Sequence, residues 1–344
     1  MKKNLGILCI LLVVFLATAF GSKNFLTAMN LFNLVERSAL YGIIGIGVAF
    51  VIITGGIDLS IGSLVGLVAI TFPYLVLTKQ VPLVVGLGAI FAISLSVGVS
   101  HGLLITKLKL QPFVVTLCGL LIYRGIARWL VADKTMGYGD EAFSGLKVLV
   151  GRLSQIEALG FEHTKEHWAY HVPVAFLIFL VLAIVAAVFL NKTIYGRYLL
   201  ALGRNEQAAR FSGINTTAMI IVAYVICSLI SGLGGLMFAL DYGSIQPANF
   251  GNFYELYAIA AAVLGGCSLR GGEGSIFGLA LGAALMRLLM NSIRMLGIDD
   301  RLEPAVIGFV ILIGVITDEV VKRIAAKRRA ILQARQATAD AGSG

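Results

Sequence analysis

The sequence predicts an all-α polytopic membrane protein with about ten transmembrane helices. Hydrophobic residues make up 58% of its 344 residues and charged residues only 13%, and the mean hydropathy is +0.93. No water-soluble domain of this size tolerates so much apolar surface, so lipid is the expected solvent for most of the chain. The 40 glycines favour close helix packing, because lipid supplies no hydrophobic drive for helix association.

The formal net charge of +9 does not indicate nucleic-acid binding. The Lys and Arg residues are spread over loops and a C-terminal tail instead of being clustered on one soluble face. We interpret them as signals of membrane topology. The four cysteines follow no disulfide or metal-binding pattern.

Apolar stretches long enough to approach a membrane span recur along the chain. We predict helices near Leu5–Phe20, Ser38–Thr54, Ile61–Leu77, Pro82–Val99, Pro112–Leu130, Val172–Leu190, Thr217–Leu240, Tyr254–Leu264, Gly274–Leu289 and Pro304–Thr317. Several are short for a full crossing, so one or two broken or re-entrant helices are an alternative. The first stretch imitates a cleavable signal peptide, but the distribution of basic residues favours a retained span.

The distribution of Lys and Arg predicts that both termini lie in the cytoplasm. Ten spans put both ends on one side, and most basic residues then lie on that side. The predicted organisation is one transmembrane domain over 1–320 and a basic cytoplasmic tail over 321–344. The domain includes a long outer loop at 131–171 and a long inner loop at 191–215.

Three arginines lie inside the predicted spans. Arg124 and Arg128 are four residues apart, so they share one helix face, beside Trp129. We expect their side chains to snorkel to the membrane interface, and the alternative is that they line an outer vestibule. Arg287 lies deeper, where an acid such as Glu303 is a candidate partner.

The outer loop contains His163, His167 and His171 at helical spacing. A helix there would align three imidazoles, which is one arrangement that binds metal ions. We expect no metal site, because exposed histidines reach this spacing by chance and no supporting residues are evident. A metal site remains the alternative.

Two glycine-rich segments repeat one pattern, at 55–67 and at 265–279. In each, an apolar run is followed by paired glycines, a residue able to cap a helix, and a new apolar run. Paired breaks in corresponding halves of a membrane bundle indicate a polar pathway through it. The predicted pathway residues are Gly55, Gly56, Asp58, Ser60, Gly62, Ser63, Gly265, Gly266, Ser268, Gly274 and Ser275.

Asp58 is the only acid between the second and third predicted spans. A buried acid near the end of a span is either a helix cap or part of an ion or proton relay. We favour the cap, because no partner for a relay lies in register with Asp58 in the sequence.

The inner loop at 191–215 carries four bases and one acid. Asn205 suits a helix N-cap, Glu206 suits the positive end of the helix, and Gly213 suits its end. This pattern predicts a short helix that docks on a partner protein. The alternative is a helix that lies on the membrane surface.

Three runs in this order, Gly55–Ser63, Gly196–Ile214 and Leu264–Ser275, together resemble the ribose, xylose and arabinose permeases of bacterial ABC importers. The resemblance covers nearly the whole chain. It departs from the family pattern at Cys267, where threonine is usual, at His101, where asparagine is usual, and in the outer loop. These departures bear on the substrate more than on the mechanism.

The resemblance implies a type II importer-like permease fold in the bacterial inner membrane, which translocates a monosaccharide such as a ribose-like pentose. It also implies a second permease subunit, identical or similar, two cytoplasmic ATP-binding subunits and a periplasmic sugar-binding protein. ATP and Mg would bind only to the ATPase partner, so no cofactor is expected on this chain. The residues that the resemblance assigns to ATPase coupling are Gly203, Asn205, Glu206, Ala208, Ala209, Arg210, Ser212 and Gly213.

The residues themselves indicate no enzyme. The sequence has no Gly-Lys-Ser or Gly-Lys-Thr and no His-Glu-x-x-His. The Gly-x-Ser-x-Gly match at Gly98–Gly102 lies within an apolar helix, where it suits helix packing. Two other functions stay open: a secondary sugar transporter driven by an ion gradient, which needs a charged site inside the membrane, and a purely structural scaffold.

Overall fold

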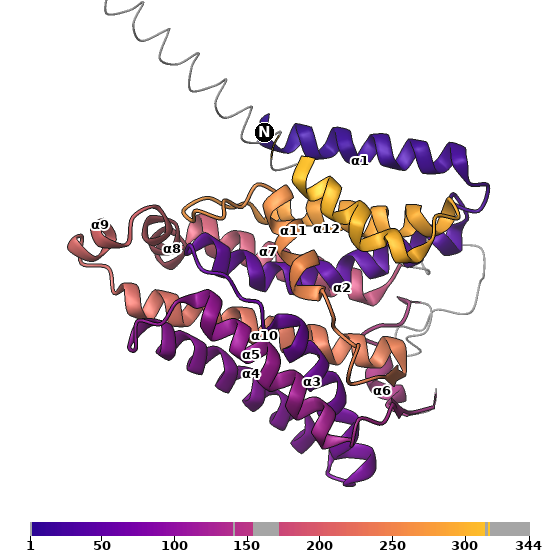
Figure 1. The fold of residues 1–344 in the computed structure, drawn as a ribbon, viewed down its shortest axis with the longest axis horizontal. Helices are drawn as coiled ribbons and strands as arrows, with labels where there is room; N and C mark the ends of the chain where they lie inside the picture. The colour runs from indigo at the N-terminus through magenta and orange to yellow at the C-terminus, as the bar shows by residue number, and fades with distance from the viewer. Residues whose placement is uncertain (1, 140–141, 154–171, 314–315, 317–344) are drawn as a thin grey trace, which may run out of the picture. The chain divides into compact units, whose positions relative to one another are not determined.

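The computed structural model describes residues 2–139, 142–153, 172–313 and 316, which are almost entirely helical (Figure 1). The helices of the first unit are α1 (Lys2–Gly21), α2 (Ala28–Ile53), α3 (Ile61–Pro73), α4 (Leu83–Thr106), α5 (Pro112–Leu130), α6 (Ser144–Lys147), α7 (Val174–Lys192), α8 (Ile194–Arg204), α9 (Glu206–Phe211), α10 (Thr216–Tyr242), α11 (Tyr254–Leu264) and α12 (Ile276–Met295). The strands β1 (Met136–Gly137) and β2 (Ser244–Ile245) pair antiparallel.

The chain divides into two units, Met1–Gly297 and Ile298–Gly344. The second unit contains a 3-10 turn at Asp300–Leu302 and a helix at 303–313. Glu303 belongs to this second unit, so its expected pairing with Arg287 stays a prediction. The predicted basic tail at 321–344 lies outside the described residues.

Within the described residues, seven helices are long and apolar enough to cross a membrane. They comprise α2, α4, α5, α7, α10, α12 and a continuous segment, Ile61–Thr78, in which α3 runs into a π-helical turn at Tyr74–Thr78. Apolar helices at Gly6–Gly21 and Tyr254–Leu264 are shorter. The 11 residues of α11 span roughly 16 Å, about half of a bilayer core, which suits a re-entrant helix. The all-α membrane fold is confirmed, and the number of ten spans stays a prediction.

Two predicted helix boundaries are wrong and one helix was missed. α2 begins at Ala28 instead of Ser38, so Glu36 and Arg37 are helical, although the prediction placed Arg37 in an outer loop. α4 continues to Thr106, so His101 lies inside the helix. α8 was not predicted at all. In each case the helix includes polar residues beyond an apolar run. Hydropathy assigns such residues to loops, whereas the helix buries part of them against neighbouring helices.

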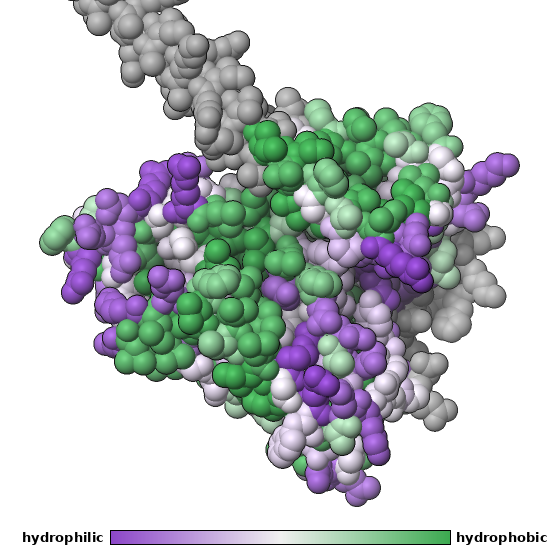
Figure 2. All heavy atoms as spheres, viewed as in Figure 1, coloured by the Kyte–Doolittle hydropathy of each residue, from purple (hydrophilic) through white to green (hydrophobic). Residues whose placement is uncertain are grey.

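α2 lies at the centre of the first unit and packs against α7, α10, α11 and α12. Its most apolar window is 83% buried, whereas the corresponding windows of α5 and α7 are 22% buried, so α5 and α7 form the periphery. Figure 2 shows the broad apolar surface that this arrangement leaves exposed on one face of the helices. Such a surface suits contact with lipid.

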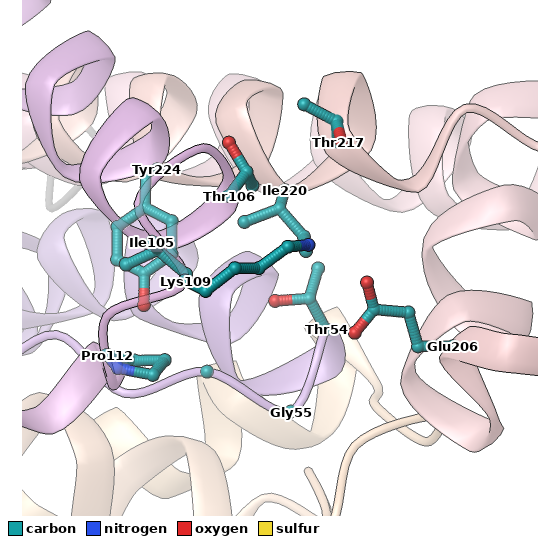
Figure 3. A pocket seen from close by; sticks show the side chains of 11 residues that line it. Thr54, Gly55, Ile105, Thr106, Lys109, Pro112, Glu206, Thr217, Ile220 and Tyr224 are labelled. Carbon is teal, nitrogen blue, oxygen red and sulfur yellow. The ribbon is translucent and has the colours of Figure 1, made fainter. Parts of the chain in front are cut away.

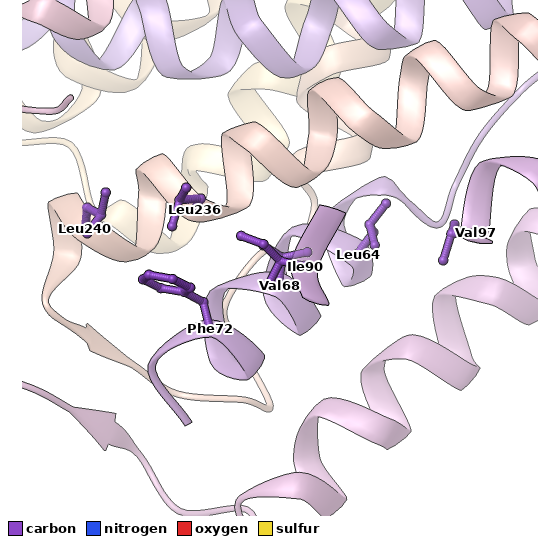
Figure 4. Close-up of a cluster of buried hydrophobic side chains, with 7 residues drawn as sticks. All are labelled: Leu64, Val68, Phe72, Ile90, Val97, Leu236 and Leu240. Atoms are coloured by element: carbon purple, nitrogen blue, oxygen red, sulfur yellow. The ribbon is translucent and has the colours of Figure 1, made fainter. Parts of the chain in front are cut away.

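α10 packs against α2, α3 and α4. Leu64, Val68 and Phe72 on α3 recur every four residues and form one helix face. They meet Ile90 and Val97 of α4 and two leucines of α10 in a buried cluster (Figure 4). This cluster holds α3 in place after the first glycine break.

Candidate functional site: two glycine breaks and the loop between α7 and α10

The first break connects α2 to α3 over residues 54–60. Gly55 adopts a φ of +81°, which L side chains rarely adopt, and its N–H donates to the Ile52 carbonyl at 2.9 Å. Asp58 is not the N-cap of α3, because that position belongs to Ser60. The Asp58 carboxylate instead accepts from both the backbone N–H (2.9 Å) and the hydroxyl (2.7 Å) of Ser60. The predicted cap is therefore wrong in position, although the carboxylate does stabilise the start of the helix.

The second break connects α11 to α12 over residues 265–275. Gly266, Gly271 and Gly272 have φ values of +93°, +82° and +73°. Ser275 caps α12, since its hydroxyl accepts from the Gly278 N–H at 3.1 Å. Ser268 does not cap the helix, because its hydroxyl accepts from the Arg270 N–H inside the loop at 3.3 Å.

Burial raises the pKa of the Cys267 thiol to about 11, so this side chain in the second break is a protonated thiol at neutral pH. Its side chain lies against Gly274, where a β-carbon would be 3.2 Å from the sulfur. A buried, protonated thiol is unreactive, and Cys267 contributes packing to the break.

The last turn of α8 meets the end of α2, where the first break begins, and the second break through backbone atoms. The Gly272 N–H donates to the Ile53 carbonyl at the end of α2, at 2.8 Å. A β-carbon on Gly203 would overlap both the Ile53 carbonyl oxygen and the Gly272 nitrogen. A β-carbon on Gly271 would lie 2.8 Å from the Gly55 nitrogen and 2.7 Å from the Gly203 oxygen. Three segments far apart in the sequence thus touch at one point, which we call the glycine junction (Gly55, Gly203, Gly271 and Gly272).

A cavity of about 190 Å³ opens beside the first break (Figure 3). Its walls come from the first break, the end of α4, the start of α5 and the starts of α9 and α10. The polar residues that line it are Thr54, Thr106, Lys109, Glu206, Thr217 and Tyr224. Lys109 extends from the α4–α5 connection, where its backbone φ is +58°, into this space. Hydroxyls, an ammonium group and a carboxylate thus make the wall of this small cavity polar.

A second cavity, of about 300 Å³, lies beside the second break. It is lined by Leu200 and Arg204 of α8 and by Gly265, Gly266, Gly272, Glu273, Gly274 and Ser275. The two cavities thus lie one at each break. The two breaks lie at the same end of the first unit, which favours like orientation of the two repeat copies.

Buried polar side chains surround Asp58 above the first cavity. Asp58 and His101 are each 2% exposed, and His101 Nδ1 lies 3.8 Å from Asp58 Oδ2. His101 Nε2 lies 2.9 Å from the hydroxyl of Tyr123 on α5. The hydroxyl of Tyr224 on α10 donates to the Ile57 carbonyl at 3.1 Å. The sequence showed no partner for Asp58, but α4 brings the ionisable side chain of His101 to it from 43 positions along the chain.

A second charged group, which the sequence reasoning missed, lies at the opposite end of α2 and α10. Arg37 Nη1 and Asp241 Oδ2 are 2.6 Å apart, and the Arg37 guanidinium lies over the Tyr242 ring at 4.6 Å. Tyr41, one turn further along α2, packs against Tyr254 at 5.1 Å between ring centroids. A sequence signal could have found this group. Arg37 and Asp241 each lie near the end of an apolar run, and charged residues at span ends are kept when they are paired.

The two span arginines have different roles. Arg124 donates to the carbonyls of Pro247 and Phe250 in the connection between β2 and α11, so it ties that loop and does not snorkel. Arg128 is exposed and forms a bidentate pair with Asp133, whose pKa this hydrogen bond holds below its usual range. The described part of the outer loop pairs through β1 with β2, and the Tyr138 hydroxyl donates to the Ala239 carbonyl. His163, His167 and His171 lie outside the described residues.

The predicted helix in the inner loop is present as α9. Its N-cap is confirmed, since the Asn205 side chain accepts from the Ala208 N–H at 2.9 Å. Gly213, with a φ of +83°, ends the turn after the helix. Phe211 is 91% exposed at the C-terminal end of α9, which leaves a large apolar side chain free on the surface.

The remaining predicted residues divide between the interior and this surface. Gly62 packs against the Gly251 backbone and the Glu255 carboxylate, where no β-carbon would fit, and Ser63 is 1% exposed. Ala209 is buried, whereas Glu206, Ala208, Arg210 and Ser212 are exposed. The structure therefore brings the predicted pathway residues together around the breaks and places the exposed coupling residues directly beside them.

Apolar helices interrupted at two glycine breaks, with polar cavities at the breaks and an amphipathic loop beside them, define a multi-span membrane permease. The chain belongs to the family described as branched-chain amino acid transport system / permease component, whose model matches residues 30–315.

Three curated relatives are similar over most of their length. The ribose import permease protein of Escherichia coli K12 is 35% identical over 308 residues, which cover 90% of this chain and 91% of the relative. The L-arabinose transport system permease protein of Escherichia coli K12 is 31% identical over 315 residues, 91% of this chain and 89% of the relative. The fructose import permease protein of Rhizobium meliloti is 30% identical over 326 residues, which cover 93% of this chain and 86% of the relative. No solved structure matches the chain.

Proposed function

We propose that the chain is the membrane-spanning permease subunit of an ATP-binding-cassette importer for a monosaccharide, a ribose-like pentose or a related sugar. The relatives named above support this proposal, because the sugars in their names, ribose, fructose and L-arabinose, are all monosaccharides. The observation that carries the mechanism is the glycine junction, where α8 touches both breaks by backbone contact. Movement applied to α8 and α9 reaches both breaks without passing through flexible side chains.

In this proposal a cytoplasmic ATPase subunit binds α9. Its exposed residues supply a charge of each sign at Glu206 and Arg210 and an apolar anchor at Phe211. A short helix with an aromatic anchor and flanking charges is a common docking element for a groove on a partner. ATP and Mg belong to that partner, and this chain needs no cofactor.

The glycine breaks are the proposed pathway. ATP binding closes the ATPase pair, α8 shifts, and the two breaks re-pack so that access alternates between the two membrane faces. The sugar enters from a periplasmic binding protein, which supplies most of the selectivity, and a second permease subunit, identical or similar, completes the channel. Both termini lie in the cytoplasm and the protein resides in the inner membrane.

The proposal is tested by reconstituting the permease with its candidate ATPase and binding protein and by replacing Arg210 with Glu. Charge reversal on α9 is expected to lower sugar-stimulated ATP hydrolysis about tenfold or more, because a like charge then faces the partner. The matched control is Lys79→Glu, the same charge change on an exposed residue before α4, at the end of that helix far from the first cavity. Full activity of Arg210→Glu, or an equal loss in the control, rejects the docking role of α9.

A secondary transporter driven by a proton gradient is the alternative. The observation in its favour is the buried Asp58–His101 pair, an ionisable site inside the membrane-spanning region. Proteoliposomes that contain only this chain discriminate the two functions: sugar uptake driven by an imposed proton gradient without ATPase supports the alternative, and its absence with ATP-dependent uptake by the full complex supports the importer.

A further inference from the structure

Asp58 and His101 face each other across a gap that no hydrogen bond closes. The 3.8 Å between His101 Nδ1 and Asp58 Oδ2 exceeds hydrogen-bond length. A bridging water needs about 4.6 Å between its partners, from two bonds of about 2.8 Å at a tetrahedral angle, so the gap is also too short for one. Nδ1 is buried and has no hydrogen-bond partner within the described residues.

The hydrogen-bond partners fix which atoms face each other. Asp58 Oδ1 already accepts twice from Ser60, so Oδ2 is the oxygen left to face His101. A proton on Nδ1 is the tautomer that lets Nδ1 donate to Asp58 Oδ2 and lets Nε2 accept from the Tyr123 hydroxyl. In this tautomer the Nδ1–H donor faces the Oδ2 acceptor at a distance about 1 Å too long for a hydrogen bond.

The segment that carries Asp58 borders the first cavity. It is preceded by the positive-φ Gly55 and by Gly56, and Gly56 and Tyr224 both line the cavity. Tyr224 holds the segment from α10 through the Ile57 carbonyl. A shift of about 1 Å would complete the Asp58–His101 hydrogen bond and pair the buried Nδ1, which is a favourable exchange.

We propose that Asp58 and His101 form a latch that holds the first glycine break closed over the cavity, with His101 as a positioning residue of the transport cycle. The latch ties the break to α4, and Tyr123 orients the imidazole from α5. This inference rests on the proposed transport function, since it names the element that opens and closes the pathway.

Two native thiols provide a local test. Cys227 lies one turn beyond Tyr224 on α10 and is fully buried, so it reports access past the first break. Cys267, 3% exposed, reports the second break. Two full-length chains are prepared in nanodiscs, one that keeps only Cys227 and one that keeps only Cys267, with serine at the other three cysteines. The rate at which a small methanethiosulfonate reagent labels the remaining cysteine is measured.

Three replacements of His101 separate its two nitrogens. Asparagine places an amide near Nδ1, toward Asp58, glutamine places one near Nε2, toward Tyr123, and alanine removes both. We expect labelling of Cys227 to rise about tenfold in His101→Ala and in His101→Gln, to stay near the parent rate in His101→Asn, and labelling of Cys267 to stay unchanged. Ser94→Ala is the control on α4, because its hydroxyl donates to the Ile90 carbonyl of the same helix.

Other results overturn the latch. Unchanged labelling of Cys227 in all variants shows that His101 does not hold the break. Parallel increases at Cys227 and Cys267 show general loosening of the fold, and equal rates in the asparagine and glutamine variants remove the role of Nδ1. The asparagine and glutamine chains keep this comparison available where the alanine chain does not fold. The labelling needs no partner, so it is independent of whether the parent complex transports a sugar.

Discussion

Two ion pairs of equal length lie in different surroundings in this protein. Arg37–Asp241 and Arg128–Asp133 both measure 2.6 Å. The side chains of the first pair are 25% and 10% exposed, and those of the second are 51% and 45% exposed. Water and salt screen the exposed pair, so the burial of the first pair decides its contribution to stability.

We predict that Asp241→Asn lowers the free energy of unfolding by about 2 kcal/mol, less than in a fully buried pair because Arg37 is a quarter exposed. The loss comes from leaving the Arg37 guanidinium without its counter-charge. The melting temperature of the purified protein measures it, with a decrease of roughly 4 °C.

Asp133→Asn is the matched control, because it removes the acid of the exposed pair. We expect its melting temperature to equal that of the parent. Equal decreases in both variants would show that burial does not separate the two pairs.

At the scale of elements, the connection between α8 and the two breaks is decided by missing side chains. Gly203 lies where any β-carbon would overlap backbone atoms of both breaks. Gly88, on α4, has open space around it, although it is a helical glycine of the same chain. Adding a β-carbon thus has opposite consequences at Gly203 and at Gly88.

We predict that Gly203→Ala destabilises the fold by about 1–3 kcal/mol through overpacking and lowers coupled transport by about tenfold or more, because α8 is pushed away from the breaks. Gly88→Ala is expected to be neutral or slightly stabilising, since alanine favours the helix. Melting temperature and sugar-stimulated ATP hydrolysis are measured for both. Normal coupling in Gly203→Ala would contradict transmission through the glycine junction.

The elements also show where local patterns suffice. The N-cap of α9 at Asn205 and its end near Gly213 were predicted correctly, because caps and glycine ends depend on neighbouring residues only. α8 was missed, although it buries Leu199 and Leu202 and exposes Tyr195. Its apolar residues look like the continuation of a loop until α7, α10 and α2 supply the surface against which α8 packs.

At the scale of the whole molecule, the helices of the first unit alternate between two ends. The α9 end contains both breaks and both cavities, and the opposite end contains β1, β2 and the Arg37–Asp241 pair. The distribution of basic residues favours the α9 end as the cytoplasmic one.

We predict that a fluorescent protein fused to the C-terminus fluoresces in cells, because it folds in the cytoplasm. Alkaline phosphatase inserted in the outer loop at 131–171 is expected to be active, because it folds only outside. Activity of the phosphatase at the C-terminus, with an inactive loop insertion, would reverse the predicted topology.

The sequence alone determined that this chain is a helical membrane protein, where its two glycine breaks lie, and that a capped helix lies in the inner loop at 191–215. Hydropathy, glycine pairs and capping residues are local properties, so these features need no knowledge of distant neighbours.

Only the tertiary structure decided which residues meet. It paired Asp58 with His101 and Arg37 with Asp241, moved Arg124 from the membrane interface to a loop contact, and joined both breaks to Gly203. The physical reason is that these contacts depend on how separate helices pack, which is set by side-chain shape and backbone approach across the bundle and not by neighbours in the chain.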